Sequence, residues 1–155
     1  MREQEILQVA ERVLARAVDL DELGVLGIAR LYLNKYNSAV PSLPPILEVR
    51  FFAMDQGREP VRDWLKSLSP DARKAIGEDI KTVQFGWPLG MPLVRKMDPG
   101  LWEVRSTIDA GIARVLFTTV GPVMVLLHGF VKKSGKTPKD DLQLAIRRAK
   151  EVHHG

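Results

Sequence analysis

The sequence predicts an α+β fold for residues 46–155: a small, twisted, mainly antiparallel sheet with helices packed on it, in the order β-α-α-β-β-β-α. Three observations lead to this prediction. A run of β-branched and aromatic residues opens this part of the chain, and two helical patterns follow it. Three strand patterns then come in close succession before a last helical pattern.

The first strand and the first two helices are marked by composition and by proline. Residues 46–53 (ILEVRFFA) have the composition of a strand. Pro60 begins a short helix, because proline suits the first helical turn, and Ser69-Pro70 begins the next one with a capping serine. Residues 85–100 hold four breaks marked by Gly or Pro, which predicts a loop with a short extended piece at 93–97.

Three strands are predicted at residues 101–106, 112–120 and 123–131. The turns between them, at 109–111 and 121–122, contain glycine and are short. Such turns join antiparallel neighbours, so the three strands should form two hairpins.

A final helix is predicted from the pattern Thr137-Pro138, with Asp140 three residues after the threonine. This spacing is typical of a helix start in which the threonine caps the first turn. Its apolar positions recur at helical spacing, at Leu142, Ala145, Ile146, Ala149 and Val152.

The first part of the chain predicts a separate helical extension. Residues 3–18 and 22–36 place apolar side chains at helical spacing, and residues 37–45 carry three prolines. We therefore expect an N-terminal helical hairpin and linker at 1–45, packed on the following domain or on a partner, and one α+β domain at 46–155.

Composition excludes several classes of protein. The chain has 155 residues and no cysteine, which excludes disulfides, thiolate metal sites and a cysteine nucleophile. We find no apolar run of the roughly 18 residues that a membrane span requires, and the polar N-terminus is unlike a signal peptide. A cytoplasmic protein is expected.

Charge is distributed unevenly along the chain. Residues 1–45 hold 5 Lys/Arg against 6 Asp/Glu, whereas residues 46–155 hold 18 against 13. The basic excess therefore belongs to the predicted α+β domain. It favours an acidic partner such as nucleic acid, and an ordinary solvated surface is the alternative.

Basic side chains recur on the three predicted strands. Arg105 and Arg114 fall on neighbouring strands, the third strand ends in Lys132-Lys133, and the preceding loop carries Arg95-Lys96. If the strands pair in hairpin order, these side chains converge on one basic concave face. The alternative for each residue alone is an exposed strand position, a charged strand end or an ion pair with Glu103.

Other chemistries have little support in the sequence. His153 and His154 lie at the C-terminus, where a frayed tail is expected, and His128 on a strand suits a structural role as well as acid–base work. Neither zinc spacing nor a carboxylate cluster is found, and phosphate-binding or nucleophile-elbow motifs are missing too. Any catalysis should therefore be metal-free.

Four segments of the sequence resemble one known family. They are FFAMDQGREPVRDWLKSL, LVRKMDPGLWEVRS, ARVLF and VLLHGFVKKSGKTPKDDLQLAIRRAKE, and they keep the family's order over residues 48–152. The chain in this range resembles the phage-derived, HigB-like branch of the RelE/HigB toxin superfamily. Residues 1–45 lie outside the resemblance.

The resemblance implies a type II toxin that cleaves mRNA on the ribosome without a cofactor and is neutralised by a helix-turn-helix antitoxin. RNA supplies its own nucleophile, the 2′-hydroxyl, so the protein must orient it, move protons and stabilise phosphate charge. Arg105 and Arg114 are the expected phosphate ligands. The remaining expected site residues are Lys96, Lys133 and His128 for catalysis, and Arg95, Lys132 and Lys136 for RNA binding.

One alternative from a different class stays open at this point. A toxin fold whose activity has decayed would bind RNA or a protein through the same basic face. Growth arrest on expression, compared with a double arginine variant, distinguishes the two.

Overall fold

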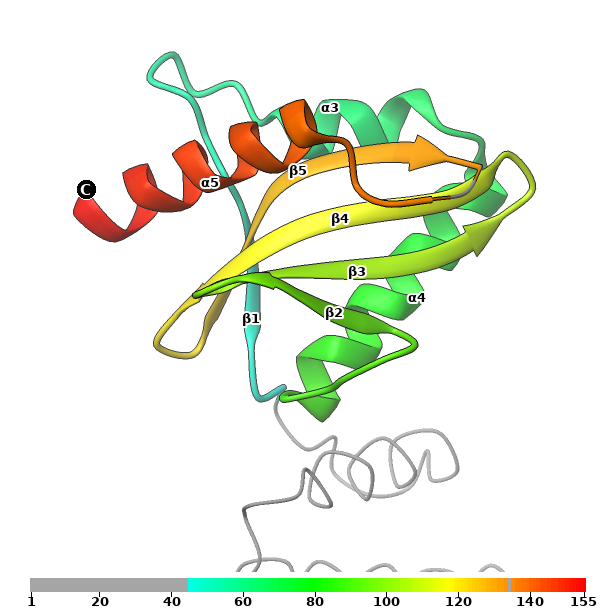
Figure 1. Ribbon diagram of the computed structural model, residues 1–155, viewed down its shortest axis with the longest axis horizontal. Helices are drawn as coiled ribbons and strands as arrows, with labels where there is room; N and C mark the ends of the chain where they lie inside the picture. The colour runs from blue at the N-terminus through cyan, green and yellow to red at the C-terminus, as the bar shows by residue number, and fades with distance from the viewer. Residues whose placement is uncertain (1–44, 134) are drawn as a thin grey trace, which may run out of the picture.

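A computed structural model describes residues 45–133 and 135–155 of the chain. The elements are β1 (Glu48–Phe51), α3 (Pro60–Ser67), α4 (Pro70–Gly86), β2 (Val94–Asp98), β3 (Leu101–Ile108), β4 (Gly111–Val120), β5 (Val123–Lys132) and α5 (Lys139–His154) (Figure 1). The predicted α+β class is confirmed for this part of the chain. The predicted helical hairpin falls on residues that lie outside the described ones.

The sheet has five strands in the order β1-β5-β4-β3-β2. The two hairpins expected from the short turns are present, because β3 pairs antiparallel with β4 and β4 with β5. β1 lies at one edge and pairs parallel with β5. The predicted order was wrong in one respect: the extended piece at 93–97 is a complete strand, β2, which pairs antiparallel with β3.

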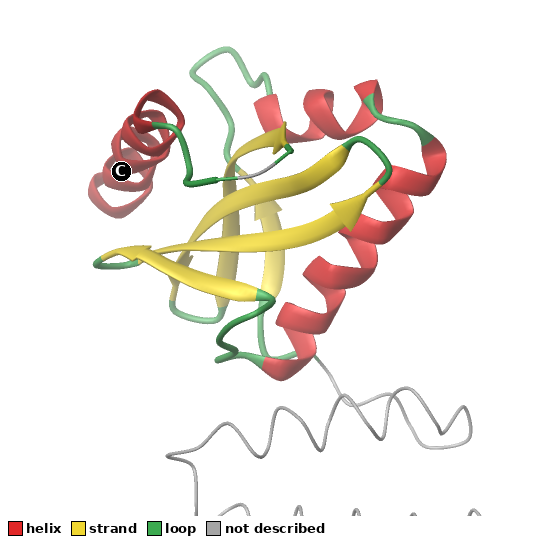
Figure 2. Cartoon of the chain, turned by 45° about the vertical axis from the view of Figure 1, so that its right-hand side comes forward, coloured by secondary structure: helices red, strands yellow, loops and turns green. Residues whose placement is uncertain are grey.

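Helices cover both faces of the sheet (Figure 2). On one face α3 contacts β5 and β1, and α4 contacts β3, while α5 crosses β4 and β5 on the other face. Ser69 caps α4 as expected, since its hydroxyl accepts a hydrogen bond from the Ala72 amide at 3.2 Å. A sheet buried on both faces explains why β4 carries an almost uninterrupted apolar run.

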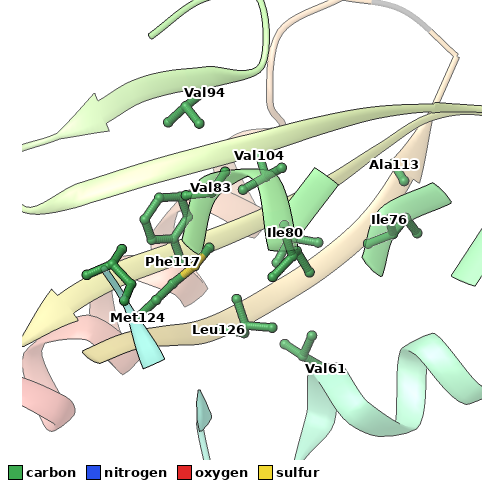
Figure 3. Packing of buried hydrophobic residues seen from close by; sticks show 12 residues of the cluster. Val61, Ile76, Ile80, Val83, Val94, Val104, Ala113, Phe117, Met124 and Leu126 are labelled. Atoms are coloured by element: carbon green, nitrogen blue, oxygen red, sulfur yellow. The ribbon is translucent and has the colours of Figure 1, made fainter. Parts of the chain in front are cut away.

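Two apolar clusters hold these layers together. The larger lies between the sheet and α3/α4, and Figure 3 shows helix residues meeting strand residues there; it includes Val61, Ile76, Ile80, Val83, Val104, Phe117 and Leu126. The smaller lies beneath α5 and includes Leu101, Leu116, Leu127 and Ala145. The face of the sheet beneath α5 therefore has a smaller apolar core than the face covered by α3 and α4. Other side chains on the α5 face lie beside this smaller core.

Gly129 lets α3 approach the sheet closely. A Cβ atom at this position of β5 would lie 2.3 Å from the indole ring of Trp64 on α3. Such a contact is far inside van der Waals range, so the glycine is required by packing rather than by backbone conformation.

Candidate functional site

A buried polar network lies on the α5 side of β3 and β4. The side chains of Arg114 and Glu103 are both fully buried, and Arg114 Nη1 lies 3.6 Å from Glu103 Oε1. Arg114 also donates from Nη1 to the Thr137 hydroxyl at 3.0 Å and from Nη2 to the carbonyl oxygen of Gly135. Thr137 in turn donates to Glu103 Oε2. The network therefore ties the segment before α5 to the middle of the sheet.

Thr137 does not act as the helix cap that its spacing predicted. α5 begins at Lys139 with Pro138 at the cap position, and no side chain caps it. The hydroxyl of Thr137 is engaged by Arg114 and Glu103 instead. Hydrogen bonds to two buried charges outweigh a local capping bond, because an unsatisfied buried charge is much more costly than an uncapped exposed amide.

Arg114, an expected phosphate ligand, is enclosed within the protein in this structure. Its side chain is 0% exposed, and two of its nitrogens are bonded inside the protein. Arg114 lies on β4, the central strand of the sheet, and the Gly135–Thr137 segment contacts its guanidinium group directly. In this structure its guanidinium group links β4 to the Gly135–Thr137 segment.

Arg105 remains open to a substrate. It lies directly opposite Arg114 on β3, and its side chain is 24% exposed. Its Nε is buried without a hydrogen-bond partner, 3.9 Å from Glu103 Oε1. The carboxylate therefore lies between two guanidinium groups, one enclosed and one accessible. This group of three carries a net charge of +1 when all are ionised.

Strand register separates Arg95 from Lys96. Arg95 is opposite Glu103 and so lies on the α5 side of the sheet, whereas Lys96 is opposite Trp102, whose ring packs in the core on the α4 side. Opposed residues of an antiparallel pair share a face. Arg95, which was expected only to bind RNA, is therefore on the face of Arg105. Lys96, the expected catalytic residue of the two, is on the opposite face.

The lysines at the end of β5 form the rim of the same face. Lys132 lies opposite Ile112, and its ammonium group donates to the carbonyl oxygen of Lys136 at 2.9 Å. Lys133 and Lys136 are exposed. Since Gly135 and Thr137 bind Arg114, the buried network also fixes where this lysine segment lies relative to β4.

His128 faces α5 because of a β-bulge. The register of β4 and β5 shifts between Leu116 and Phe117, which leaves Leu127 without an opposite residue. Leu127 packs beneath α5, and the next residue, His128, faces α5 as well, opposite the buried Leu116. A bulge commonly redirects a side chain in this way.

The contacts of His128 favour a structural role. Its Nε2 lies 2.6 Å from a carboxylate oxygen of Asp141 on α5, and its ring stacks on Phe130 with 5.7 Å between centroids. A carboxylate only accepts, so Nε2 carries the donated hydrogen. The imidazole is only 18% exposed and links β5 to the first turn of α5.

The C-terminal half of α5 is also anchored, which corrects the expectation of a frayed tail. His153 Nε2 lies 2.9 Å from the Thr118 hydroxyl, which itself donates to the carbonyl oxygen of Gly100. Arg148 donates to the carbonyl oxygen of Leu127 at 2.8 Å. Burial lowers the pKa of Arg148 below its usual value, and the neighbouring Glu151 acts in the opposite direction.

Two further observations concern the residues at 45–133 and 135–155. They contain no group of three or more histidine, aspartate and glutamate side chains placed to hold a metal ion. None of their helices has both the length and the apolar character needed to cross a membrane.

A family model described as phage-derived protein Gp49-like (DUF891) matches residues 63–150, more than half of the chain. The chain belongs to the Gp49-like family. This is a family of RelE-like toxins. A search of the curated proteins found no match.

The Gp49-like match covers the whole candidate site. It starts within α3 and ends within α5, so it includes the buried network, Arg105 and the lysine rim. The predicted boundary at residue 45 lies outside the matched range. Residues 1–62 and 151–155 lie outside the matched range.

Sequence reasoning missed two residues of this candidate site, Thr137 and Asp141. Both precede or begin α5 and look like local helix-start residues. A signal was present nonetheless. Arg114 interrupts a largely apolar strand, and a buried charge needs polar partners from elsewhere in the chain.

Proposed function

We propose that the chain is the toxin of a type II toxin–antitoxin system, of the HigB-like branch, and that it cleaves mRNA on the ribosome. Membership of a RelE-like toxin family supports the class. The single observation that carries the chemistry is Arg105, a partly exposed side chain whose Nε lies 3.9 Å from the buried Glu103 carboxylate. Action on ribosomes would place the protein in the cytoplasm.

The proposed reaction uses a nucleophile that the RNA supplies. The 2′-oxygen attacks the adjacent phosphorus, its proton passes to a base, and the bond from phosphorus to the 5′-oxygen breaks as that oxygen takes up a proton. Negative charge builds up on the phosphate oxygens during attack. Arg105 is placed to stabilise it, because a guanidinium group can donate two parallel hydrogen bonds while keeping its charge.

The rim lysines complete the proposed site. Lys132 and Lys133 lie at the end of β5 and Lys136 in the segment that Arg114 anchors, so all three contribute positive charge near the RNA backbone. Lys133 and Lys136 are both exposed, and Lys133, which directly follows β5, is the residue we assign to proton transfer. The proposed partners are mRNA on the ribosome and a helix-turn-helix antitoxin that covers this face.

A non-enzymatic binding module is the second candidate, and the burial of Arg114 favours it. Only one of the two expected phosphate-binding arginines is accessible, which leaves fewer cations for transition-state stabilisation than the sequence suggested. A decayed toxin fold would still bind RNA or a protein through the lysine rim.

The deciding experiment is expression of the full chain without an antitoxin, followed by mapping of mRNA 5′ ends. We expect growth arrest and new 5′ ends within translated codons. Arg105→Ala should reduce the cleavage rate by roughly 100- to 1,000-fold, as loss of one oxyanion donor does in other enzymes. Lys150→Ala, an exposed change on α5, should retain toxicity. A folded Arg105→Ala protein that cleaves at the wild-type rate would remove this residue from the site.

A further inference from the structure

Residues 135–138, which lead into α5, turn back over β4 (Figure 1). The carbonyl oxygen of Gly135 accepts a hydrogen bond from Arg114 Nη2, and the guanidinium group that donates it is fully buried. The next carbonyl oxygen, that of Lys136, accepts from the ammonium group of Lys132 at 2.9 Å. Two consecutive peptide groups therefore have their carbonyl oxygens bonded to cations.

The direction of the Gly135 carbonyl group fixes the direction of the next amide. The peptide bond between Gly135 and Lys136 is trans. In a trans peptide the carbonyl group and the following N–H point in opposite directions. The Gly135 carbonyl points inward to the buried Arg114, so the Lys136 N–H points outward, and both residues are exposed. The Lys136 N–H donates to no other described residue and is therefore available to a ligand.

The surroundings of this amide favour an anion. Hydrogen bonds in a chain strengthen one another, because a donor at the carbonyl oxygen draws electron density away from the N–H of the same peptide group. Here that donor, Arg114, carries a full positive charge and is shielded from solvent. The exposed Lys133 and Lys136 add positive charge around the amide. Backbone N–H groups at turns bind phosphate in the same way in other proteins.

We propose that the backbone N–H of Lys136 binds a phosphate oxygen of the RNA, in an orientation that Arg114 fixes from below. The buried network links this amide to Arg105. Glu103 Oε1 lies 3.9 Å from Arg105 Nε, and Oε2 accepts a hydrogen bond from Thr137, the residue after Lys136. This inference rests on the proposed nuclease function, because it adds a contact to the same substrate.

The first test follows the Lys136 amide by NMR while a ribotrinucleotide with 2′-O-methyl groups is added to the full chain. The methyl groups block the nucleophile, so the measurement records binding and not cleavage. We expect a saturable downfield shift of the Lys136 amide proton, whereas the amide of Gly121, in the exposed turn before β5, should not move. A titration without a downfield shift at Lys136 would overturn the inference.

The second test compares Lys136→Pro with Lys136→Ala. Both changes remove the ammonium group, but only proline also removes the backbone N–H. A hydrogen bond to a charged group contributes about 10- to 150-fold in affinity, so the proline variant should bind the trinucleotide more weakly than the alanine variant by that factor. Equal affinities of two folded variants would overturn the inference. If the proline variant does not fold, the wild-type NMR titration decides.

The positioning role of Arg114 has a readout of its own. Arg114→Lys keeps a charged donor beneath the Gly135 carbonyl, whereas Arg114→Met removes it. Measured on the folded fraction, the lysine variant should bind the trinucleotide more tightly and hold the Lys136 amide proton further downfield before RNA is added. Equal shifts and equal affinities in the two variants would exclude Arg114 from this role.

Cleavage on ribosomes separates this inference from the proposed function. Wild-type protein that leaves translated mRNA intact, while its Lys136 amide still responds to the trinucleotide, would overturn the function and keep the phosphate contact. Equal cleavage rates of folded Lys136→Pro and Lys136→Ala would overturn the contact and keep the function.

Discussion

Replacing Thr137 by valine should cost about 3 kcal/mol of stability. Valine keeps the side-chain volume but removes the hydroxyl that accepts from Arg114 at 3.0 Å and donates to Glu103. Hydrogen bonds to charged groups contribute about 1.5–3 kcal/mol each. Arg114 and Glu103 keep their contact at 3.6 Å, which places the expected loss toward the lower end of the sum. In a domain of about 110 residues this corresponds to a fall in Tm of about 12 °C.

The assay is urea and thermal unfolding of the full chain, with two comparison variants. Thr137→Ser keeps the hydroxyl and should stay within about 1 kcal/mol of wild type. Thr82→Val removes a threonine hydroxyl that donates only to the Glu78 carbonyl oxygen on the surface of α4, and it should be close to neutral. Equal stability of the valine and serine variants at 137 would refute the network argument, because the hydroxyl would then contribute nothing to the buried charges.

Three further changes test the same structure. Arg114→Met should destabilise the domain by about 3–5 kcal/mol in urea unfolding, because it removes the buried charge partner of Glu103 and leaves only the more distant Arg105; a loss below about 1 kcal/mol would contradict this. Gly129→Ala should cost about 1–3 kcal/mol, since the new methyl group meets Trp64, and a neutral result would mean that α3 packs differently. Arg105→Ala should stay within about 1 kcal/mol of wild type in the same assay while losing toxicity.

Local patterns predicted most of the elements because each depends on neighbouring residues. The helix starts at Pro60 and at Ser69 follow from backbone preferences, and the two hairpins follow from turn length. β2 was harder to recognise. Its sequence is short and lies among Gly and Pro residues, and its stability comes from pairing with β3, which no local pattern encodes.

The candidate site was predictable in composition but not in geometry. Strand alternation placed Arg105 and Glu103 on one face correctly, yet it could not tell that Arg114 on the next strand would be enclosed. Enclosure depends on what covers a residue, here the segment that contains Thr137. The same limit applied to Lys96, whose face is fixed by its register with β3 and not by the sequence around it.

The two opposed arginines differ in their surroundings, and we assign them different roles: Arg114 stabilises the fold, and Arg105 is the proposed phosphate ligand. Like charges directly opposite each other on paired strands repel, so Arg105 and Arg114 can occupy these positions only with a compensating charge nearby. Glu103 supplies it, with one oxygen 3.6 Å from Arg114 Nη1 and 3.9 Å from Arg105 Nε. Because Arg114 is buried, its side chain is occupied by contacts with Glu103 and Thr137. Arg105 approaches Glu103 through Nε, and its two Nη atoms stay available. Neutralising Glu103 should therefore lower both stability, through Arg114, and the proposed phosphate binding, through Arg105. Neutralising Arg105 should harm only the second.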